Sequence, residues 1–432
     1  MATLERVAML KPMIPPAWLC AIALGAALLG FAGSAAWGAL QPQVVAGSAA
    51  AGGDVAATPF VDARQFGVRC DGRTDDTAAL NALLARQAGH RIVLPAGTCR
   101  YSGGGVLRDG TVLAGNGRNA TLVSVTAAAP AQVLTVSGYG AGVQDLGMIA
   151  AVPQTGGSWI ALSGTESWLS EFQIAGDFNG IHLTGVGARV SHGRMIRGAA
   201  GATRILVDGG DTSELIEGVL IGADEGAPLA GIRIRHAAAL IISDTSVIGQ
   251  ATNLLIDPGA DQVVASLAVS NSFFDNGERA NVAIEPGKGG SVVRSRLTGV
   301  WAGSSHKSDG VAIDTSMGGQ VMGLHFIDMH AVLNAGDGIR LAGKVSDVVI
   351  QGGVFAANRN GIAAESGRDI IVSAAMIGPF GGLAANRANG VAIAPGVTGY
   401  VISGSIVRGN TRGQIDDRGV ASAKRLTENL VE

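Results

Sequence analysis

A short alternation of apolar and variable positions recurs along the chain from about residue 133 to residue 415. Each copy has a small or turn residue, then an apolar, a variable and an apolar residue, and successive copies begin 21 to 29 residues apart. Repeats of this length indicate a stacked array in which no unit can bury its apolar face alone. The copies are Leu134–Val136, Ile160–Leu162, Ile181–Leu183, Ile205–Val207, Ile232–Ile234, Leu254–Ile256, Val282–Ile284, Val311–Ile313, Ile339–Leu341, Ile362–Ala364 and Val391–Ile393.

The repeating unit is predicted to consist of strands. Apolar residues alternate with period two, and Val and Ile dominate, as a pleated surface prefers. Glycine contributes 66 of 432 residues, about twice the usual ~7%, and many glycines lie where turns need positive φ. We therefore predict an all-β chain: a single-stranded, right-handed parallel β-helix of about a dozen turns stacked ~4.8 Å apart, whose two ends alone expose strand edges.

The first 40 residues have the features of a secretory signal peptide. Arg6 and Lys11 precede an apolar run over residues 17–32, and small residues follow it. This run is shorter than the ~18–20 residues of a membrane span, and an uncleaved anchor is the alternative. Residues 41–57 are rich in Ala and Gly and are expected to be a flexible linker. The mature protein is thus expected to be secreted or periplasmic, with no stable membrane span.

Residues 58–101 differ from the repeats and are predicted to cap the β-helix. Thr74 or Asp75 is a suitable N-cap for a helix that ends near residue 89. A strand is expected to follow from Ile92. Such a short amphipathic helix can cover an open core. Its apolar face consists of Leu80, Leu83 and Leu84.

The segment VDARQFGVRCDGRTDDTAALNALLA…RIVLPAGTCRY resembles the N-terminal signature of the pectate-lyase-like superfamily. The resemblance covers about 43 residues, and it implies an extracellular right-handed parallel β-helix. Members are often polysaccharide hydrolases or lyases, including phage tailspikes and rhamnogalacturonase-like enzymes. The signature marks the cap and not the active site. Polygalacturonase-type catalytic motifs are not intact in this chain, which puts that hydrolase chemistry and galacturonan as substrate in doubt.

The remaining boundaries and the cysteines follow from this assignment. The β-helix proper is expected over residues 102–420, followed by a polar tail over residues 421–432. Cys70 and Cys99 flank the predicted helix, so a disulfide could fix the cap in an oxidising compartment. The alternative is that they are two unrelated small buried residues.

A second strand in each repeat offers a register for surface residues. We align these strands on their last inward apolar residue and take the residue three positions earlier as outward-facing. In five successive repeats this outward position holds an acid or a histidine. The inward residues are Met148, Ile174, Met195, Leu220, Val247, Phe273, Leu297, Phe326, Val354, Met376 and Ile406, and the first five outward residues are Asp145, Glu171, His192, Glu217 and Asp244.

Stacked acids at this position indicate a substrate groove. Like charges opposed across strands cost roughly 0.2–1 kcal/mol each, so a purely structural sequence tends to avoid them; a solvated outer face is the alternative. Carboxyl groups on adjacent or alternate turns would lie at separations suited to glycoside hydrolysis. We predict Glu217 and Asp244, with Glu171 as alternative partner, as acid–base residues, and His192 and Arg194 as substrate-orienting residues.

Further positions are expected to contact substrate. The same strip turns basic some turns later, and a Trp occupies a nearby loop. No Cys/His cluster has zinc spacing, and no resident metal is predicted, although a lyase would use Ca²⁺ on these acids with an Arg as base. The additional substrate-binding candidates are Asp145, Arg294, Arg296, His325 and Trp301.

One pair of acids is interpreted as structural. Asp309 and Asp337 hold the positions that Asn360 and Asn389 hold in later repeats. Because Asn and Asp before Gly are turn formers, we expect their loss to affect mainly stability.

The sequence as a whole predicts an exported polysaccharide-cleaving enzyme, a hydrolase or a lyase, that acts on one face of the β-helix. The alternative is a non-catalytic exported β-helix that binds glycan or serves as a scaffold, which the 4% aromatic content favours. The formal net charge of −3 gives no argument for nucleic acid.

The N-terminal pattern makes one prediction about processing. Protein collected from the exported fraction of its native host should begin between about Trp37 and Leu40, because the small residues there suit signal peptidase. N-terminal sequencing measures this, and a soluble cytoplasmic species that retains Met1 would contradict it.

Overall fold

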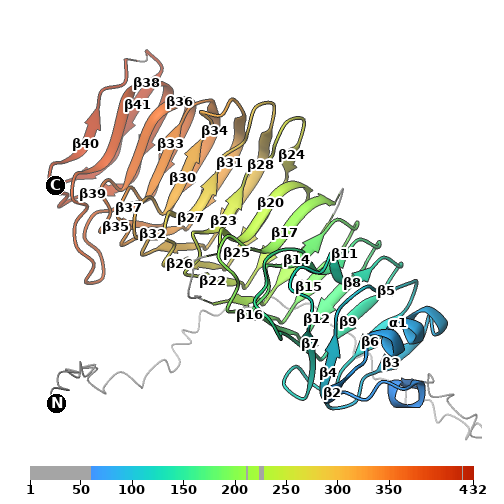
Figure 1. The fold of residues 1–432 in the computed structure, drawn as a ribbon. Helices are drawn as coiled ribbons and strands as arrows, with labels where there is room; N and C mark the ends of the chain where they lie inside the picture. Colours follow the sequence, from blue (N-terminus) through green and yellow to red (C-terminus); the bar gives the residue numbers. More distant parts are fainter. Residues whose placement is uncertain (1–59, 211–212, 223–227, 421) are drawn as a thin grey trace, which may run out of the picture. The chain divides into compact units, whose positions relative to one another are not determined.

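The computed structural model describes residues 60–210, 213–222, 228–420 and 422–432. The predicted signal peptide and linker lie outside these ranges. The described chain is all-β apart from one 3₁₀ turn and one short helix, and its strands wind as a right-handed parallel β-helix, as predicted (Figure 1). No helix in the described ranges is both long and apolar enough to span a membrane.

One sheet of 27 strands forms most of the wall of the coil. Its strands are β1 (Val61–Asp62), β3 (Arg91–Val93), β5 (Gly105–Leu107), β6 (Val112–Ala114), β8 (Gln132–Val136), β9 (Gly142–Gln144), β11 (Ser158–Leu162), β12 (Trp168–Ser170), β14 (Asn179–Leu183), β15 (Arg189–Ser191), β17 (Thr203–Gly210), β18 (Leu215–Glu217), β20 (Ala230–Ala238), β21 (Ile241–Ser243), β23 (Thr252–Ile256), β24 (Val263–Ala265), β25 (Ala268–Ser270), β27 (Ala280–Ile284), β28 (Ser291–Thr298), β30 (Val311–Asp314), β31 (Gln320–Ile327), β33 (Ile339–Ala342), β34 (Val345–Gln351), β36 (Ile362–Ser373), β38 (Asn389–Ser403), β40 (Gly413–Asp417) and β41 (Lys424–Thr427).

The second sheet has 15 strands, and each pairs in parallel with the corresponding strand of the coil before and after it. Its strands are β2 (Asp71–Asp75), β4 (Gly97–Tyr101), β7 (Thr121–Val125), β10 (Gly147–Ala150), β13 (Gln173–Ala175), β16 (Arg194–Ile196), β19 (Leu220–Ile221), β22 (Ser246–Ile248), β26 (Phe273–Asp275), β29 (Trp301–Gly303), β32 (His330–Val332), β35 (Val354–Ala356), β37 (Met376–Ile377), β39 (Ile406–Val407) and β42 (Leu430–Val431).

The register of the repeated triplets is confirmed. Each copy pairs with the next at the predicted residue, from Leu134 opposite Ile160 to Ile362 opposite Val391. The first and third residues of the triplets point inward and are buried, so the apolar side chains stack along the core. Dispersion contacts between these stacked side chains and the parallel hydrogen-bond ladder act at the same positions of every coil.

The cap contains the predicted helix, which begins slightly later than expected. α1 spans Thr77–Arg86 with Asp76 as N-cap residue, and not Thr74 or Asp75, because the segment before it is taken up by β2. A 3₁₀ turn, η1 (Ala63–Phe66), precedes it. The leucine face is buried as predicted: Leu80, Leu83 and Leu84.

Strands continue through both end segments. β2 and β4, within the segment assigned to the cap, pair with each other, and β4 also pairs with β7. β41 and β42, within residues 421–432, pair with β38 and β39. The expected cap and tail therefore contribute strands to the same two sheets as the repeats.

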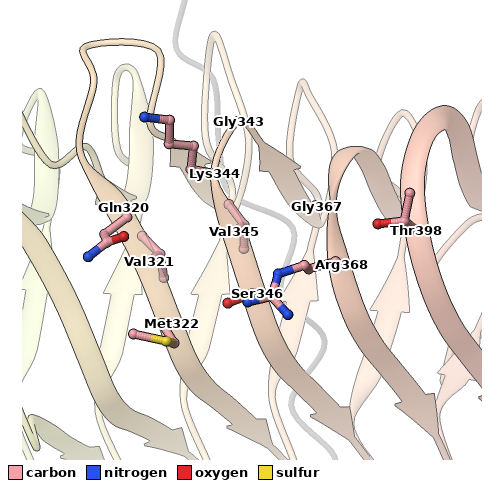
Figure 2. A pocket seen from close by; sticks show the side chains of 10 residues that line it. All are labelled: Gln320, Val321, Met322, Gly343, Lys344, Val345, Ser346, Gly367, Arg368 and Thr398. Carbon is pink, nitrogen blue, oxygen red and sulfur yellow. The ribbon is translucent and has the colours of Figure 1, made fainter.

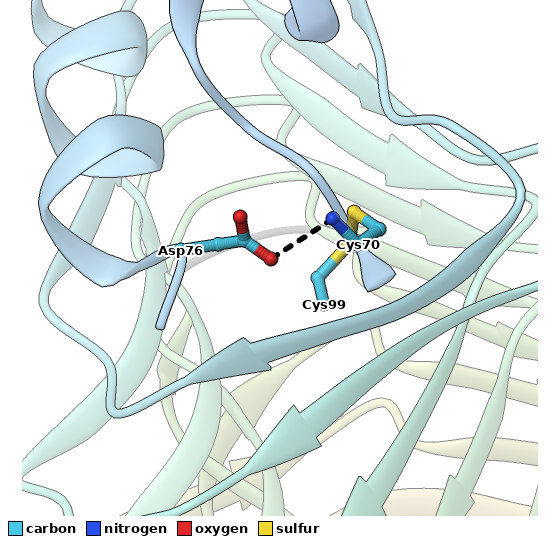
Figure 3. A group of neighbouring side chains, drawn as sticks. All are labelled: Cys70, Asp76 and Cys99. Atoms are coloured by element: carbon cyan, nitrogen blue, oxygen red, sulfur yellow. Dashed lines mark hydrogen bonds between the residues drawn. A yellow bond between two sulfur atoms is a disulfide. The ribbon is translucent and has the colours of Figure 1, made fainter. Parts of the chain in front are cut away.

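A disulfide joins Cys70 to Cys99 beside the helix, in agreement with the sequence (Figure 3). The fully buried Asp76 carboxylate accepts hydrogen bonds from the backbone N–H groups of Arg69 at 2.7 Å and Cys70 at 3.1 Å. The start of the helix is thus tied to the segment that carries the disulfide.

The acids interpreted as structural form a buried ladder with their asparagine equivalents. Asp309 accepts from the N–H of Asp337 at 2.7 Å, Asp337 from that of Asn360 at 3.0 Å, and Asn360 from that of Asn389 at 3.0 Å. All four side chains are buried. The first three side chains therefore each satisfy a backbone donor of the following coil.

A second buried ladder is made of asparagine amides, and the sequence analysis did not anticipate it. Asn334 Nδ2 donates to Asn358 Oδ1 at 2.9 Å, and Asn386 Nδ2 donates to Asn410 Oδ1 at 2.8 Å. The amides also donate to backbone carbonyls, as Asn358 does to Ala331. Stacked amides thus satisfy polar groups inside the coil that water cannot reach.

Removing the disulfide should destabilise the cap. It closes a loop with a sequence separation of 29, for which the chain-entropy model gives a loss of about 3–4 kcal/mol in free energy of unfolding. Denaturant unfolding of the Cys70→Ser/Cys99→Ser variant against oxidised wild type measures this. Two freely alkylated thiols in the exported wild-type protein would contradict the bond itself.

Asp337 offers a test of the structural ladder. Asp337→Ala leaves the N–H of Asn360 and the guanidinium of Arg359 without their buried acceptor, and should lower the free energy of unfolding by about 1–3 kcal/mol. Asp337→Asn keeps an acceptor at the same position, as Asn360 does naturally, and is the matched control. Equal unfolding midpoints for the two variants would contradict the ladder's role.

Candidate functional site

One residue per coil adopts the left-handed conformation where the chain passes from the larger sheet to the smaller one. Its N–H donates to a carbonyl of the next coil, as Asp244 does to Ser270 at 3.2 Å. Glycine, Asn, Asp and His tolerate positive φ better than other residues do. The residues in this turn column are Asp145, Glu171, His192, Gly218, Asp244, Asn271, Gly299, Asp328, Gly352, Ala374, Gly404 and Glu428.

The predicted acidic column is therefore a column of turns, and one member is misplaced. Asp145, Glu171, His192 and Asp244 do share it. Glu217 does not: it is the last residue of β18, it pairs with Ser191 and Ser243, and its neighbour Gly218 takes the turn position. Turn conformation supplies a physical reason for Asp and His here that requires no substrate.

Contacts among the column residues are few and exposed. Nδ1 of His192 lies 3.8 Å from Oε1 of Glu171, and both side chains are more than half exposed. Gln144 Nε2 donates to Asp145 at 2.5 Å.

The remaining predicted residues lie on other surfaces. Arg194 and Trp301 occupy one outward column on the smaller sheet, four coils apart. Arg296 pairs with His325 on the larger sheet. Arg294 is misplaced in the predicted strip, because it has φ of 50° at a different bend, within β28.

The misplacements have a common cause. Where two apolar residues adjoin, alternation alone does not tell which one faces inward. The strand alignment is right at Met148, Ile174, Met195 and Val247, and elsewhere it slips to the neighbouring residue or to the preceding strand. The inward residues of the later coils are Ile221, Phe274, Ala302, Ala331, Phe355, Ile377 and Val407, each three positions after its turn residue.

Two hollows lie on the outer faces of β31, β34, β36 and β38, one on each side of a bend in these strands, and together we call them the bend groove. Its first hollow, of about 290 Å³, is lined by polar and cationic side chains (Figure 2). The Lys344 ammonium and the Arg368 guanidinium stand at its wall, with Gln320, Met322 and Thr398 around them.

The second hollow of the bend groove continues along the same strands and holds about 420 Å³. Val349, Ile371 and Val401 form an apolar floor, because they are successive outward residues in one register. The volumes of the two hollows are near the lower end of the range of ligand sites. Two carboxylates, Asp347 and Asp369, stand at the edge of this floor.

The bend itself comes from a second column of left-handed residues. Gly323, Asp347, Asp369 and Gly399 follow one another in successive coils, all with positive φ. They separate the two outward-facing segments of each strand, which form the two hollows. The glycines at either side of the acids add no side chain, which leaves the carboxylates accessible.

Each of the two carboxylates in the bend groove accepts a hydrogen bond from the residue before it. Arg368 Nη1 donates to Asp369 Oδ2 at 2.7 Å, and the Ser346 hydroxyl donates to Asp347 Oδ2 at 2.9 Å. The two acids occupy equivalent positions of adjacent coils, because their flanking residues pair directly. Within the described residues, the Lys344 ammonium has no carboxylate within 4.0 Å.

A buried phenol closes the far end of the bend groove. Tyr400 donates its hydroxyl to Asp417, and Lys424 Nζ donates to the same carboxylate at 3.0 Å. Burial, and then the hydrogen bond to Asp417, raise the pKa of Tyr400 above its usual value. The phenol therefore remains protonated and holds the last coil against the groove.

Sequence analysis identified His325 in the bend groove but missed Asp347, Asp369, Lys344 and Arg368. The sequence does contain a pattern from which the two acids could have been aligned. The segments Val345–Ile350, Gly367–Val372 and Val397–Ile402 share one spacing, with the left-handed residue third in each. Aligning them would have stacked the two acids.

The N-terminal part of the described chain matches a known protein family. Residues 60–154 match a family described as rhamnogalacturonase A/epimerase, pectate lyase-like. The resemblance to the pectate-lyase-like superfamily predicted from the cap signature is confirmed for this segment. No curated protein sequence matches the chain significantly.

Solved structures share the fold across most of the chain. The A-module of mannuronan C-5 epimerase AlgE4 from Azotobacter vinelandii has 16% identity and a TM-score of 0.57, covering 87% of this chain and 100% of that one. Tailspike protein 3 of bacteriophage CBA120 has 17% identity and a TM-score of 0.58, covering 85% and 59%. The catalytic unit of a GH87 α-1,3-glucanase from Streptomyces thermodiastaticus has 16% identity and a TM-score of 0.51, covering 87% and 70%. At these identities the likeness establishes the fold alone.

Proposed function

We propose that this protein is an exported glycoside hydrolase that cleaves a polysaccharide in the bend groove. The observation that carries the proposal is the pair of accessible carboxylates, Asp347 and Asp369, at equivalent positions of adjacent coils. Adjacent strands are spaced about 4.8 Å apart. Carboxyl groups about 5–5.5 Å apart are typical of retaining hydrolases, so we infer retention of anomeric configuration.

The surroundings assign a role to each acid. Asp369 receives the Arg368 guanidinium, which orients its carboxylate for attack on the anomeric carbon. Asp347 protonates the leaving oxygen as Asp369 bonds to the anomeric carbon and the glycosidic bond breaks. It then takes a proton from the water that displaces Asp369 and releases the sugar. Lys344 and Gln320 bind substrate hydroxyls in the first hollow, and the apolar floor of the second hollow receives the C–H face of a sugar ring.

The match to a rhamnogalacturonase A/epimerase family supports a glycan as the substrate. The similar structures named above include an epimerase and a glucanase, so this fold supports more than one reaction on glycans. Export is proposed from the N-terminal sequence pattern.

The acids predicted from sequence are a second candidate for the same chemistry. Glu217 and Asp244 lie on adjacent coils, offset by one residue, with Glu171, His192 and Arg194 on nearby coils. They share no residue with the bend groove, so substitutions separate the two candidates. The same acids carry the oxygen ligands that Ca²⁺ prefers, which is the arrangement a Ca²⁺-dependent lyase would use.

The proposal predicts the effect of isosteric substitutions. Asp347→Asn and Asp369→Asn should each lower turnover about 10²- to 10⁴-fold without a change in unfolding midpoint, because both side chains are exposed and Asn tolerates the left-handed conformation. Release of reducing ends from a panel of acidic and neutral polysaccharides measures this.

Glu217→Gln and Asp244→Asn are the matched controls and should retain turnover. Loss of activity in these two variants alone would transfer the chemistry to the turn column. Ultraviolet absorbance from unsaturated uronate products would overturn hydrolysis in favour of a lyase. Wild-type protein that binds polysaccharides of the panel but cleaves none would support the non-catalytic alternative.

A further inference from the structure

Three aromatic rings follow one another in tilted contact on the outer face of the smaller sheet, away from the bend groove. Phe273 pairs with Trp301 and Trp301 with His330, in the successive strands β26, β29 and β32. Their ring centroids lie 6.4 Å and 6.0 Å apart, with interplanar angles of 30° and 33°. We call these three residues the aromatic ladder.

The aromatic ladder faces solvent. Phe273 is 52% exposed while its neighbour Phe274 is fully buried, which corrects the inward orientation predicted for Phe273. His330 is exposed and Trp301 is half-buried. Single exposed apolar residues are ordinary, but an exposed ring on each of three consecutive coils is a continuous platform.

One carboxylate holds the central ring of the aromatic ladder, and further acids lie close to the ladder in the sequence. Trp301 Nε1 donates to Asp275 Oδ1 at 3.4 Å, which holds the indole. Asp328 is the exposed turn residue two positions before His330. In the loops that leave β26 and β29, Lys307 is paired with Glu278 at 2.5 Å, so its charge is compensated.

We propose that the aromatic ladder is a second saccharide-binding surface, which takes a neutral glycan chain running along the coil axis. Each ring stacks on the C–H face of a sugar, while the rim carboxylates accept hydrogen bonds from hydroxyl groups. One ring per coil, at ~4.8 Å per strand, suits a polymer of ring-shaped units. The inference deepens the proposed function, because it adds a site that holds the substrate outside the bend groove.

The charges around the aromatic ladder favour an uncharged ligand over an anionic one. Aromatic ladders also stack the bases of single-stranded nucleic acid, but those sites combine the rings with a positive groove. Here the nearby acids in the sequence are Asp275 and Asp328, and the cations of the adjoining loops, Lys307 and Arg279, are each paired with a glutamate. Carboxylates repel phosphate and uronate alike, so a neutral saccharide fits and an anionic polymer does not.

The aromatic ladder and the bend groove share one coil. β31 contributes to the groove and β32 carries His330, and the two strands belong to one coil, joined through Asp328. The aromatic ladder thus ends on the coil where the bend groove begins. A chain held on the rings would therefore be bound on a coil that also contributes to the bend groove, on another of its faces.

Binding is measured by calorimetry with neutral and uronic oligosaccharides of equal length, using the Asp347→Asn/Asp369→Asn protein so that no ligand is consumed in the groove. Adding Phe273→Ala/Trp301→Ala should weaken binding of a neutral oligosaccharide about tenfold. Tyr139→Ala removes an exposed aromatic outside the aromatic ladder and should leave affinity unchanged. Unfolding midpoints verify that each variant is folded.

Equal affinity of the ring variant and its parent, absence of binding to every neutral oligosaccharide, or preferential binding of uronates would each overturn the inference. Turnover separates this result from the proposed function. Phe273→Ala/Trp301→Ala in an otherwise wild-type chain should keep kcat on short substrates and raise KM on long ones. If the carboxylate variants lose kcat and the Phe273→Ala/Trp301→Ala variant shows no change in KM, the proposed function stands and the binding role of the aromatic ladder is refuted.

Discussion

Parallel pairing between equivalent positions of successive coils is the constraint on which the whole structure depends. Once one residue of a triplet is opposite its counterpart, every other residue of the coil has a fixed neighbour above and below. Apolar residues then stack in the core, and turn residues stack at the corners. The side-chain amides of Asn334 and Asn358 stack in the same way. The same constraint creates surface columns, in which side chains far apart in sequence become adjacent.

This constraint explains which parts of the structure were predictable. The register of the triplets was predicted correctly throughout. Because apolar and variable residues alternate in each triplet, only one orientation of the strand places the apolar side chains in the core. The helix of the cap was predictable from three leucines at helical spacing. The register of the shorter strands was less secure, because Leu220 and Phe273 adjoin other apolar residues and only the distance from the turn residue identifies the buried one.

The candidate site could be predicted only in part, for a related reason. His325 was named from a strand alignment that had slipped at this coil, whereas Asp347 and Asp369 resemble ordinary turn acids until the bends of two coils are superimposed. Conversely, Asp145, Glu171 and Asp244 drew attention because acids recur there, and the left-handed backbone conformation accounts for the two aspartates. Residue type alone does not separate a carboxylate that ends a strand from one that faces a groove.

The turn column separates the chemistry of the surface from the pairing of the coils. Its backbone hydrogen bonds run from the N–H of one coil to the carbonyl of the next and do not involve the side chain. Asp, Asn and His all hold positions there, because each tolerates the left-handed conformation. The side chains of this surface row can therefore differ from coil to coil while the ladder beneath them keeps one pattern.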